Sequence, residues 1–182
     1  SWDWLGTKIY VEHCDSEKNG EYEKGFLNID DEIDTINRLK ETYKISFSLN
    51  WGRSAIEGKN PSHVLVHIDK LKKIGLLKGF IFSGTSNRDP IYGDWKDNHM
   101  PFNKIYDVKN YKLNSLLTYD NVKKTLKSLS KAEIEYIGIK ILSLPLKNFN
   151  LEKRVGLNVD ALKILGAMVK ELKFHSENYI LK

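Results

Sequence analysis

Residues 50 to 57 carry polar side chains of the types that bind and transform small molecules. Asn50, Arg53, Ser54 and Glu57 follow one another within this short stretch, together with Trp51. The planar guanidinium of Arg53 suits a carboxylate or a phosphate on a substrate, because it donates parallel hydrogen bonds to such groups. An ion pair with Glu57, four residues on, is the alternative. We predict a substrate-binding loop here rather than a plain turn.

The elements on either side of this loop place it at one edge of a sheet. Apolar and polar residues alternate from Ile45 to Asn50, which predicts a strand. Asn60, as N-cap, and Pro61 predict that a helix begins at about residue 61. In parallel α/β folds every strand delivers its last residues to one common face, and ligands bind there.

The same order of strand and helix recurs along the chain. It occurs four times without a β-hairpin signal, which predicts a parallel sheet and an α/β fold. The predicted strands span 8–11, 45–50, 77–82 and 136–142, and the predicted helices span about 30–43, 61–74, 118–129 and 159–172.

Four such units are half of a (β/α)8 barrel of the TIM type. A small open α/β sheet is the alternative, although no glycine-rich nucleotide loop accompanies it. Half a barrel would leave two unpaired edge strands, and the chain begins at Ser1 rather than at Met. We therefore expect residues 1–182 to form a single domain, the C-terminal part of a barrel whose N-terminal strands are missing.

Four polar residues end the predicted strands and are expected to open into one shared mouth: Glu12, Asn50, Ser83 and Lys140. Glu12 is the first choice for a general acid or base; a carboxylate that only holds Arg53 or Lys140 is the alternative. An ammonium aimed into a barrel polarises a carbonyl, and desolvation would suit Lys140 to base or Schiff-base chemistry. A purely structural pair of Lys140 with Glu12 is the competing interpretation.

Four histidines and the cysteine are expected to have structural roles and no part in the chemistry of the strand ends. His13 should face the opposite side of its strand from Glu12, as a core hydrogen-bonding residue. Cys14 is expected to be a small apolar filler. Three further histidines are predicted on helices away from the strand ends and are given no chemistry: His63, His67 and His175.

A long irregular segment spans roughly residues 87 to 113. Its aromatic residues and two prolines favour an ordered, functional loop over a disordered one. Trp95, like Trp51, would stack on a sugar ring or pack the rim of the barrel. Asp97 and His99 form either a pair of metal ligands or a hydrogen-bonded pair.

Composition excludes several classes of protein. The formal charge of +5 comes from lysines spread along helices, and no nucleic-acid-binding motif accompanies them. No apolar run approaches the ~20 residues of a membrane span, and we expect neither a membrane span nor a signal peptide within these residues. The single cysteine excludes an intrachain disulfide and fits a reducing, cytoplasmic compartment.

Several of these stretches together resemble DUF4862, an uncharacterised bacterial family. They are residues 11–15 (Val-Glu-His-Cys-Asp), 50–58, 79–84 and 97–101. That family is similar to the xylose-isomerase-like barrels of the sugar phosphate isomerase/epimerase superfamily. The resemblance covers nearly the whole chain and implies strands five to eight of a barrel.

The superfamily resemblance also implies a divalent metal held by Glu, Asp, His and Glu at four strand ends. Glu12 matches the first position, whereas Asn50, Ser83 and Lys140 depart from the other three. A remodelled metal site of Glu12 with Asp97 or His99 remains a candidate.

The residues and the resemblance together predict proton transfer next to the carbonyl of a sugar or sugar phosphate. Glu12, Lys140 and His99 form the predicted catalytic group. Substrate contacts are assigned to Asn50, Trp51, Arg53, Ser83, Trp95 and Asp97. One alternative is a glycoside hydrolase or lyase that pairs Glu12 with Asp97 or Glu57. Another is a non-catalytic carbohydrate-binding barrel that uses Trp51 and Trp95.

Overall fold

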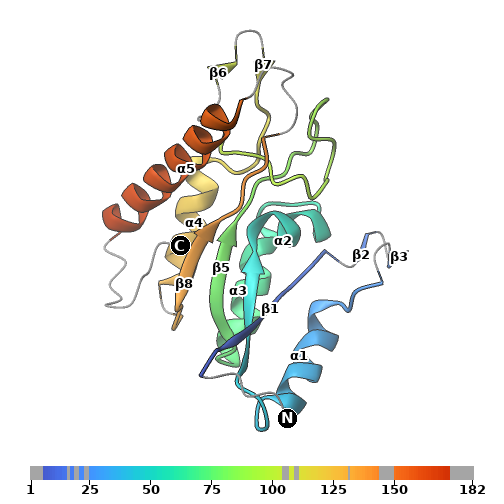
Figure 1. The fold of residues 1–182 in the computed structure, drawn as a ribbon. Coiled ribbons are helices and arrows are strands. Elements are labelled where there is room, and N and C mark those ends of the chain that lie inside the picture. Colours follow the sequence, from blue (N-terminus) through green and yellow to red (C-terminus); the bar gives the residue numbers. More distant parts are fainter. Residues whose placement is uncertain are drawn as a thin grey trace.

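Four parallel strands form the centre of the protein, in a computed structural model that describes residues 6–15, 17–18, 21–22, 25–103, 107–108, 111–130, 132–143 and 150–172. Their order in the sheet is β1-β4-β5-β8, and every neighbouring pair is parallel (Figure 1). The strands are β1 (Ile9–Glu12), β4 (Ile45–Asn50), β5 (Leu77–Phe82) and β8 (Tyr136–Ile139). The predicted α/β fold with a parallel sheet is confirmed.

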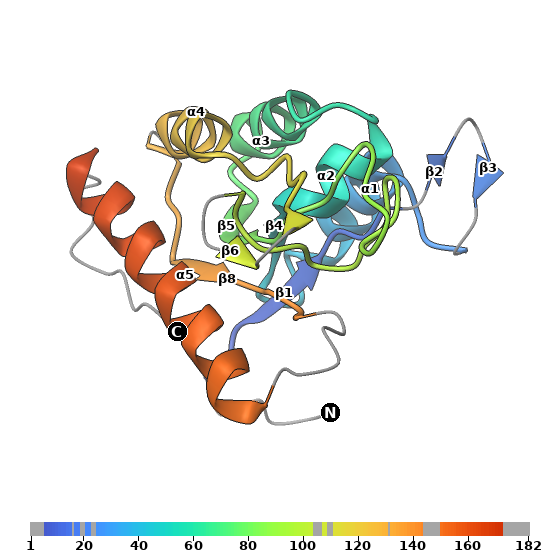
Figure 2. The ribbon, with the colours of Figure 1, turned by 90° about the horizontal axis from the view of Figure 1, so that it is seen from above.

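Five helices accompany the sheet in the described part of the chain. They are α1 (Ile29–Leu39), α2 (Trp51–Glu57), α3 (His63–Lys73), α4 (Tyr119–Leu129) and α5 (Leu151–Glu171). Thr118 and Asp120 are both candidates for the cap of the helix predicted at 118–129, and in the structure Thr118 takes this place: its Oγ1 accepts a hydrogen bond from Asn121 N at 3.2 Å at the start of α4. Figure 2 shows α3 and α4 side by side along one face of the sheet and α5 beside β8.

Two helix boundaries differ from the prediction for local reasons. The predicted N-cap Asn60 instead accepts a hydrogen bond from Ser62 N, and α3 begins two residues later, at His63. α5 begins at Leu151, eight residues earlier than predicted, where the side chain of Asn150 caps it. Leu151 and Val155 are exposed, so the first turns of α5 lack the buried stripe that marks a helix in a sequence.

Two short antiparallel pairs interrupt the alternation of strand and helix. β2 (Glu17–Lys18) pairs with β3 (Glu21–Tyr22), and β6 (Asp107–Val108) pairs with β7 (Tyr111–Lys112). The expectation that no hairpin occurs is therefore wrong. Two-residue strands are too short to show the alternation by which a strand is recognised.

The two faces of the sheet differ in what covers them. Phe47, Leu49, Phe80 and Phe82 are fully buried in a core shared with the helices. The alternate positions face the other way, as strand geometry requires. They include residues that line a hollow of about 550 Å³, namely Tyr10, Ile81, Tyr136, Gly138 and Lys140.

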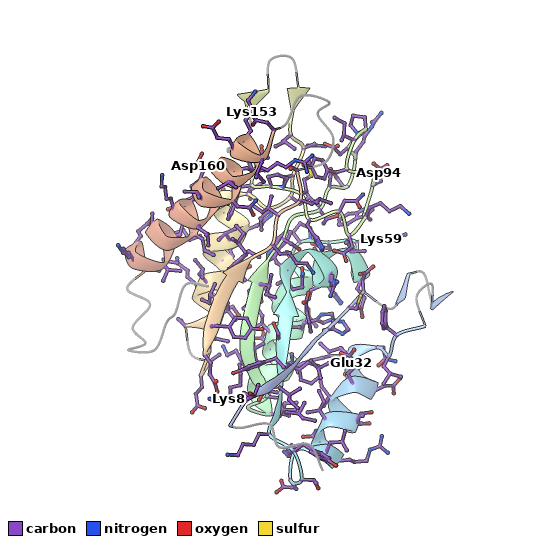
Figure 3. The ribbon with its side chains drawn as sticks, in the orientation of Figure 1. Lys8, Glu32, Lys59, Asp94, Lys153 and Asp160 are labelled. Carbon is purple, nitrogen blue, oxygen red and sulfur yellow. The ribbon has the colours of Figure 1, made fainter. Side chains whose placement is uncertain are left out.

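The segment after β5 is ordered by its own polar groups, as predicted for 87–113 in its described part. Asp89 Oδ1 accepts hydrogen bonds from the backbone N–H groups of Ile91 and Tyr92, and Tyr92 Oη donates to Leu142 O at 2.9 Å. The segment lies beyond the carboxyl ends of the strands, and Asp94 within it lies far from Lys8 at the opposite end of the sheet (Figure 3). A loop held in this way covers the strand ends.

Among the residues that the structure describes, no helix combines the length and the apolar character needed to cross a membrane.

The close approach of this segment to the end of β5 gives a stability prediction. Gly84 and Met100 exchange backbone hydrogen bonds of 2.8 Å, and a Cβ at position 84 would lie 2.3 Å from Met100 O. We expect Gly84→Ala to lower the free energy of unfolding by about 2 kcal/mol in urea denaturation, because backbone must move. In the matched control Gly138→Ala the new Cβ meets nothing within 4 Å, and the change should be under about 0.5 kcal/mol. Equal effects of the two substitutions would contradict this packing.

Candidate functional site

The four predicted strand-end residues lie together in the structure. Asn50 Nδ2 donates to Glu12 Oε1 at 3.0 Å, and Ser83 Oγ donates to Asn50 Oδ1 at 2.6 Å. Lys140 Nζ lies 3.8 Å from Glu12 Oε1. The four residues thus meet at the carboxyl ends of β1, β4, β5 and β8, as expected. A ligand-binding mouth at this place, and the chemical roles of its residues, remain predictions.

Asn50 is the centre of this group of side chains. Its Oδ1 accepts from Ser83 Oγ and from the backbone N–H groups of Gly52 and Arg53, at 3.0 and 3.3 Å. The two backbone contacts make Asn50 the N-cap of α2, so the stretch predicted as a loop is a helix. Gly52 is required at this turn, because a Cβ there would lie 2.8 Å from Ser83 O.

Asn50 and Ser83 were both predicted to contact the substrate, and the structure corrects this. Both side chains are fully buried. They hold the end of β1 against the start of α2, and a small molecule that arrives from solvent does not reach them. Their function in the site is to position Glu12 and Arg53.

Arg53 joins two carboxylates that are far apart in the sequence. Its NH1 group donates to Glu12 Oε1 at 2.8 Å, and its Nε donates to Asp97 Oδ2 at 3.0 Å. The alternative ion pair with Glu57 is not formed, because Glu57 contacts His13 instead. Arg53 thus reaches the mouth as an internal counter-ion, and a substrate oxyanion would share it with two protein carboxylates.

Asp97 and His99 approach the mouth from the long segment after β5. Nδ1 of His99 lies 3.0 Å from Asp97 Oδ1. Burial raises the pKa of Asp97, but His99 and the Arg53 guanidinium outweigh it and hold the pKa well below its usual range. His99 has φ of +48°, a left-handed conformation that is costly for a side chain with a Cβ, and Leu142 N donates to its carbonyl at 2.9 Å.

The two tryptophans assigned to sugar stacking differ in position. Trp51 is fully buried, and its Nε1 donates to Thr125 Oγ1 of α4 at 3.1 Å. The expectation that Trp51 stacks on a ligand is therefore wrong, because the first turn of α2 directs this ring into the core. Trp95 is partly exposed and has φ of +50°, and its stacking role remains a prediction.

The donor set at the strand ends does not fit the metal that the superfamily resemblance implies. Only Glu12 supplies a carboxylate, whereas the amide of Asn50 is used as a cap and Lys140 supplies a cation. The remodelled set of Glu12, Asp97 and His99 does not converge either, since the guanidinium of Arg53 bridges Glu12 and Asp97. We derive no chemical step through a metal at this mouth.

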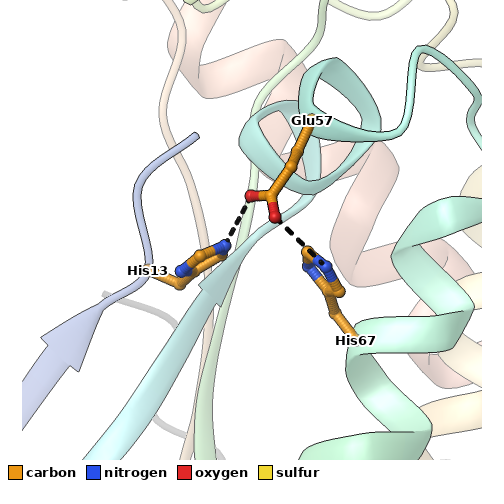
Figure 4. A group of neighbouring side chains, drawn as sticks. All are labelled: His13, Glu57 and His67. Carbon is orange, nitrogen blue, oxygen red and sulfur yellow. Dashed lines mark hydrogen bonds and ion pairs between the residues drawn. The ribbon is translucent and has the colours of Figure 1, made fainter. Parts of the chain in front are cut away.

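A second polar cluster lies on the other side of the end of β1. His13 Nε2 donates to Glu57 Oε2 at 2.8 Å, and its Nδ1 donates to Glu32 Oε2 at 2.7 Å. His67 Nε2 lies 3.9 Å from Glu57 Oε1 (Figure 4). The Nδ1 atom of His67 lies 3.1 Å from Ser54 Oγ. The prediction that His13 is a buried hydrogen-bonding residue is confirmed.

His67 was given no chemistry from the sequence, whereas the structure places it in this cluster. The buried stripe of α3, in which His67 takes its place beside Val64, Ile68 and Leu71, is the signal that could have revealed it. His63 packs edge-on against His67, with 4.5 Å between ring centroids. His175 lies outside the described residues.

The two buried imidazoles have opposite preferences for a proton. Burial lowers the pKa of His13, but its hydrogen bonds to Glu32 and Glu57 outweigh burial and raise the pKa to about 9. Burial lowers the pKa of His67, and the neighbouring His13 lowers it further, to about 2. His13 therefore carries the positive charge of this cluster near neutral pH, while His67 stays neutral.

Comparison with known proteins gives a family but no activity. The model of a domain of unknown function, DUF4862, matches residues 1–157. An uncharacterized protein of Salmonella typhimurium is 32% identical over 165 residues, which are 91% of this chain and 49% of that protein. The chain thus spans about half the length of this curated relative. No solved structure matches the chain.

The raised pKa of His13 predicts a dependence of stability on pH. A group with a raised folded pKa stabilises the fold fully below its ordinary pKa of 6.5, and this contribution is lost as the pH rises through about 9. We expect the free energy of unfolding, measured by urea denaturation in buffers that contain EDTA, to fall by up to about 3 kcal/mol as the pH rises from 6.5 to about 9. His13→Gln should remove the fall, whereas the control His63→Gln should retain it. A wild-type stability that is flat across the window would refute the assignment.

Proposed function

We propose, for a chain that belongs to the DUF4862 family of unknown function, that its strand ends move a proton next to the carbonyl of a sugar or sugar phosphate. The observation that carries this proposal is the environment of Glu12. The hydrogen bonds that its carboxylate accepts from the described residues Asn50 and Arg53 are both made by Oε1, and Lys140 Nζ lies 3.8 Å from the same oxygen. Oε2 is therefore left for a substrate, on a side chain that is 27% exposed.

These contacts supply what a general acid or base requires. Asn50 and Arg53 fix the orientation of the Glu12 carboxylate before a substrate arrives, so little reorganisation is needed in the reaction. Glu12 Oε2 would accept the proton from the carbon next to a carbonyl and return it to the same or the neighbouring carbon. The first outcome is epimerisation, and the second is isomerisation.

Lys140 supports the proposal as the positive charge that faces the developing oxyanion. Its side chain is 42% exposed, and it lines the hollow on the face of the sheet opposite the core of Phe47 and Phe80. The ammonium is near Glu12 without being locked in a short ion pair, so it is able to reach a substrate oxygen. Stabilising an enediolate in this way is the electrostatic contribution that a divalent metal makes in other enzymes.

We propose further that the four strand–helix units are part of a (β/α)8 barrel. The sheet has the sequential parallel order of such a barrel, and its outer strands β1 and β8 each have one strand neighbour among the described residues. In the curated relative the matched region is about half of the protein, which is the proportion that four of eight units would occupy. Closing the barrel would enclose the hollow beside Lys140.

The alternative functions receive less support. A glycosidase needs two carboxylates that face each other across the substrate, whereas Arg53 bridges Glu12 and Asp97, and Glu57 faces the histidine cluster. A carbohydrate-binding barrel would rely on stacking, and the burial of Trp51 leaves Trp95 for that purpose. The pairing of Glu12 with Lys140 suits proton transfer better than it suits glycoside hydrolysis or carbohydrate binding without catalysis.

Exchange of the substrate's carbon-bound hydrogen with solvent tests the proposal. Full-length protein would be incubated in D2O with aldoses, ketoses and their phosphates, and the loss of the proton next to the carbonyl would be followed by NMR. We expect Glu12→Gln to slow exchange by about 100-fold or more with little change in sugar affinity. Lys140→Met should also slow it by about 100-fold.

Two exposed residues provide matched controls for this experiment. Glu41→Gln and Lys73→Met make the same chemical changes on the surface and should leave exchange unaltered. Binding without any exchange in the wild-type protein would favour the carbohydrate-binding alternative. Exchange that survives Glu12→Gln would refute Glu12 as the acid or base.

A further inference from the structure

We propose that His13, Glu57 and His67 bind a divalent transition-metal ion, with Zn²⁺ as the preferred ion. This site lies on the opposite side of the end of β1 from Glu12 and is separate from the strand-end mouth. It does not depend on the proposed sugar chemistry. Within the described residues, this is the group of His, Cys, Asp and Glu side chains whose ligand atoms converge, all within 4.8 Å of one another.

The two imidazoles face different oxygens of one carboxylate. His13 Nε2 lies 2.8 Å from Glu57 Oε2, and His67 Nε2 lies 3.9 Å from Glu57 Oε1. Figure 4 shows both rings directed at Glu57, from the segment after β1 and from α3, with Glu57 on α2. An ion among these atoms would have two nitrogen donors and two carboxylate oxygens, which is a four-atom set of the kind that Zn²⁺ accepts.

The outer partners of both histidines are those of metal ligands. Nδ1 of His13 lies 2.7 Å from the Glu32 carboxylate, and Nδ1 of His67 lies 3.1 Å from Ser54 Oγ. The Glu32 carboxylate accepts a hydrogen bond from Nδ1 of His13, and Ser54 Oγ is able to accept one from Nδ1 of His67, which would direct both Nε2 atoms to the ion. Histidine ligands in metalloproteins almost always donate their second ring N–H to a carboxylate or another acceptor in this way.

Charge and burial give an independent reason for a dication. His13 and His67 are almost fully buried, and the side chains of Glu32 and Glu57 are 12% and 10% exposed. A divalent cation would offset the charge of carboxylates held away from water in this way, and burying an uncompensated charge is costly. On coordination, a proton on Nε2 of His13 would be released to solvent, and the metal would take its place.

The nitrogen donors of the two histidines favour a transition-metal ion over Ca²⁺ or Mg²⁺. Imidazole nitrogen suits Zn²⁺ and its neighbours in the first transition series, whereas Ca²⁺ and Mg²⁺ prefer oxygen donors alone. The ligands and their partners come from the end of β1, α1, α2 and α3. A bound ion would therefore fasten three helices to the end of the strand that carries Glu12, and its main effect would be on stability.

Metal titration of the untagged, EDTA-treated full-length protein tests this site. We expect one Zn²⁺ per chain by equilibrium dialysis with elemental analysis, and a rise in melting temperature with added ZnCl2. Glu57→Gln and His67→Gln should abolish stoichiometric binding. Glu32→Gln removes only an outer partner and should weaken binding by about 10- to 100-fold.

Control variants separate this site from its neighbours. His63 packs against His67 but is not one of the proposed ligands, so His63→Gln should keep one Zn²⁺ per chain. Asp97→Asn changes the strand-end mouth and should also keep one Zn²⁺ per chain. If His67→Gln does not fold, the visible absorption spectrum of the wild-type protein with added Co²⁺ tests the site instead. Co²⁺ in a four-coordinate site absorbs visible light intensely. Lack of stoichiometric Zn²⁺ binding, or binding lost in Asp97→Asn but kept in Glu57→Gln, would overturn the proposal.

Discussion

The buried amide of Asn50 is the interaction on which the arrangement of the strand ends depends. One side chain ends β4, caps α2, receives Ser83 from β5 and donates to Glu12 at the end of β1. Because its Oδ1 is occupied by three donors, its Nδ2 group must face the carboxylate. A single fully buried amide thus fixes three neighbouring strands and one helix relative to each other. Buried polar groups of this kind are stable only when all their partners are present.

The mouth is arranged around balanced charges rather than around a metal. Arg53 lies between Glu12 and Asp97, and Lys140 approaches the same oxygen of Glu12 from β8. The positions that would supply ligands in a metal-dependent barrel here hold an amide, a hydroxyl and an ammonium. Under the proposed function, Asn50 and Ser83 would position the carboxylate, and Lys140 would supply the positive charge that a metal ion supplies in such a barrel.

The alternation of side chains at the end of β1 separates two kinds of chemistry. Glu12 faces the exposed mouth, and His13, the next residue, faces the helices, where it meets Glu32 and Glu57. The two sites share a strand end but draw on different elements. The mouth uses the long segment after β5, whereas the histidine cluster uses α1, α2 and α3.

The sequence by itself determined the parallel α/β fold, strands β4 and β5 to the residue, and the meeting of Glu12, Asn50, Ser83 and Lys140. These features follow from local periodicity and from the rule that parallel strands end at one edge. Only the tertiary structure decided that Trp51 is buried, that Arg53 contacts Asp97 rather than Glu57, and that His67 meets His13 across α2. Those outcomes depend on how a short helix is rotated and on where a distant loop returns. Packing between elements sets both, and no pattern within a single element records it.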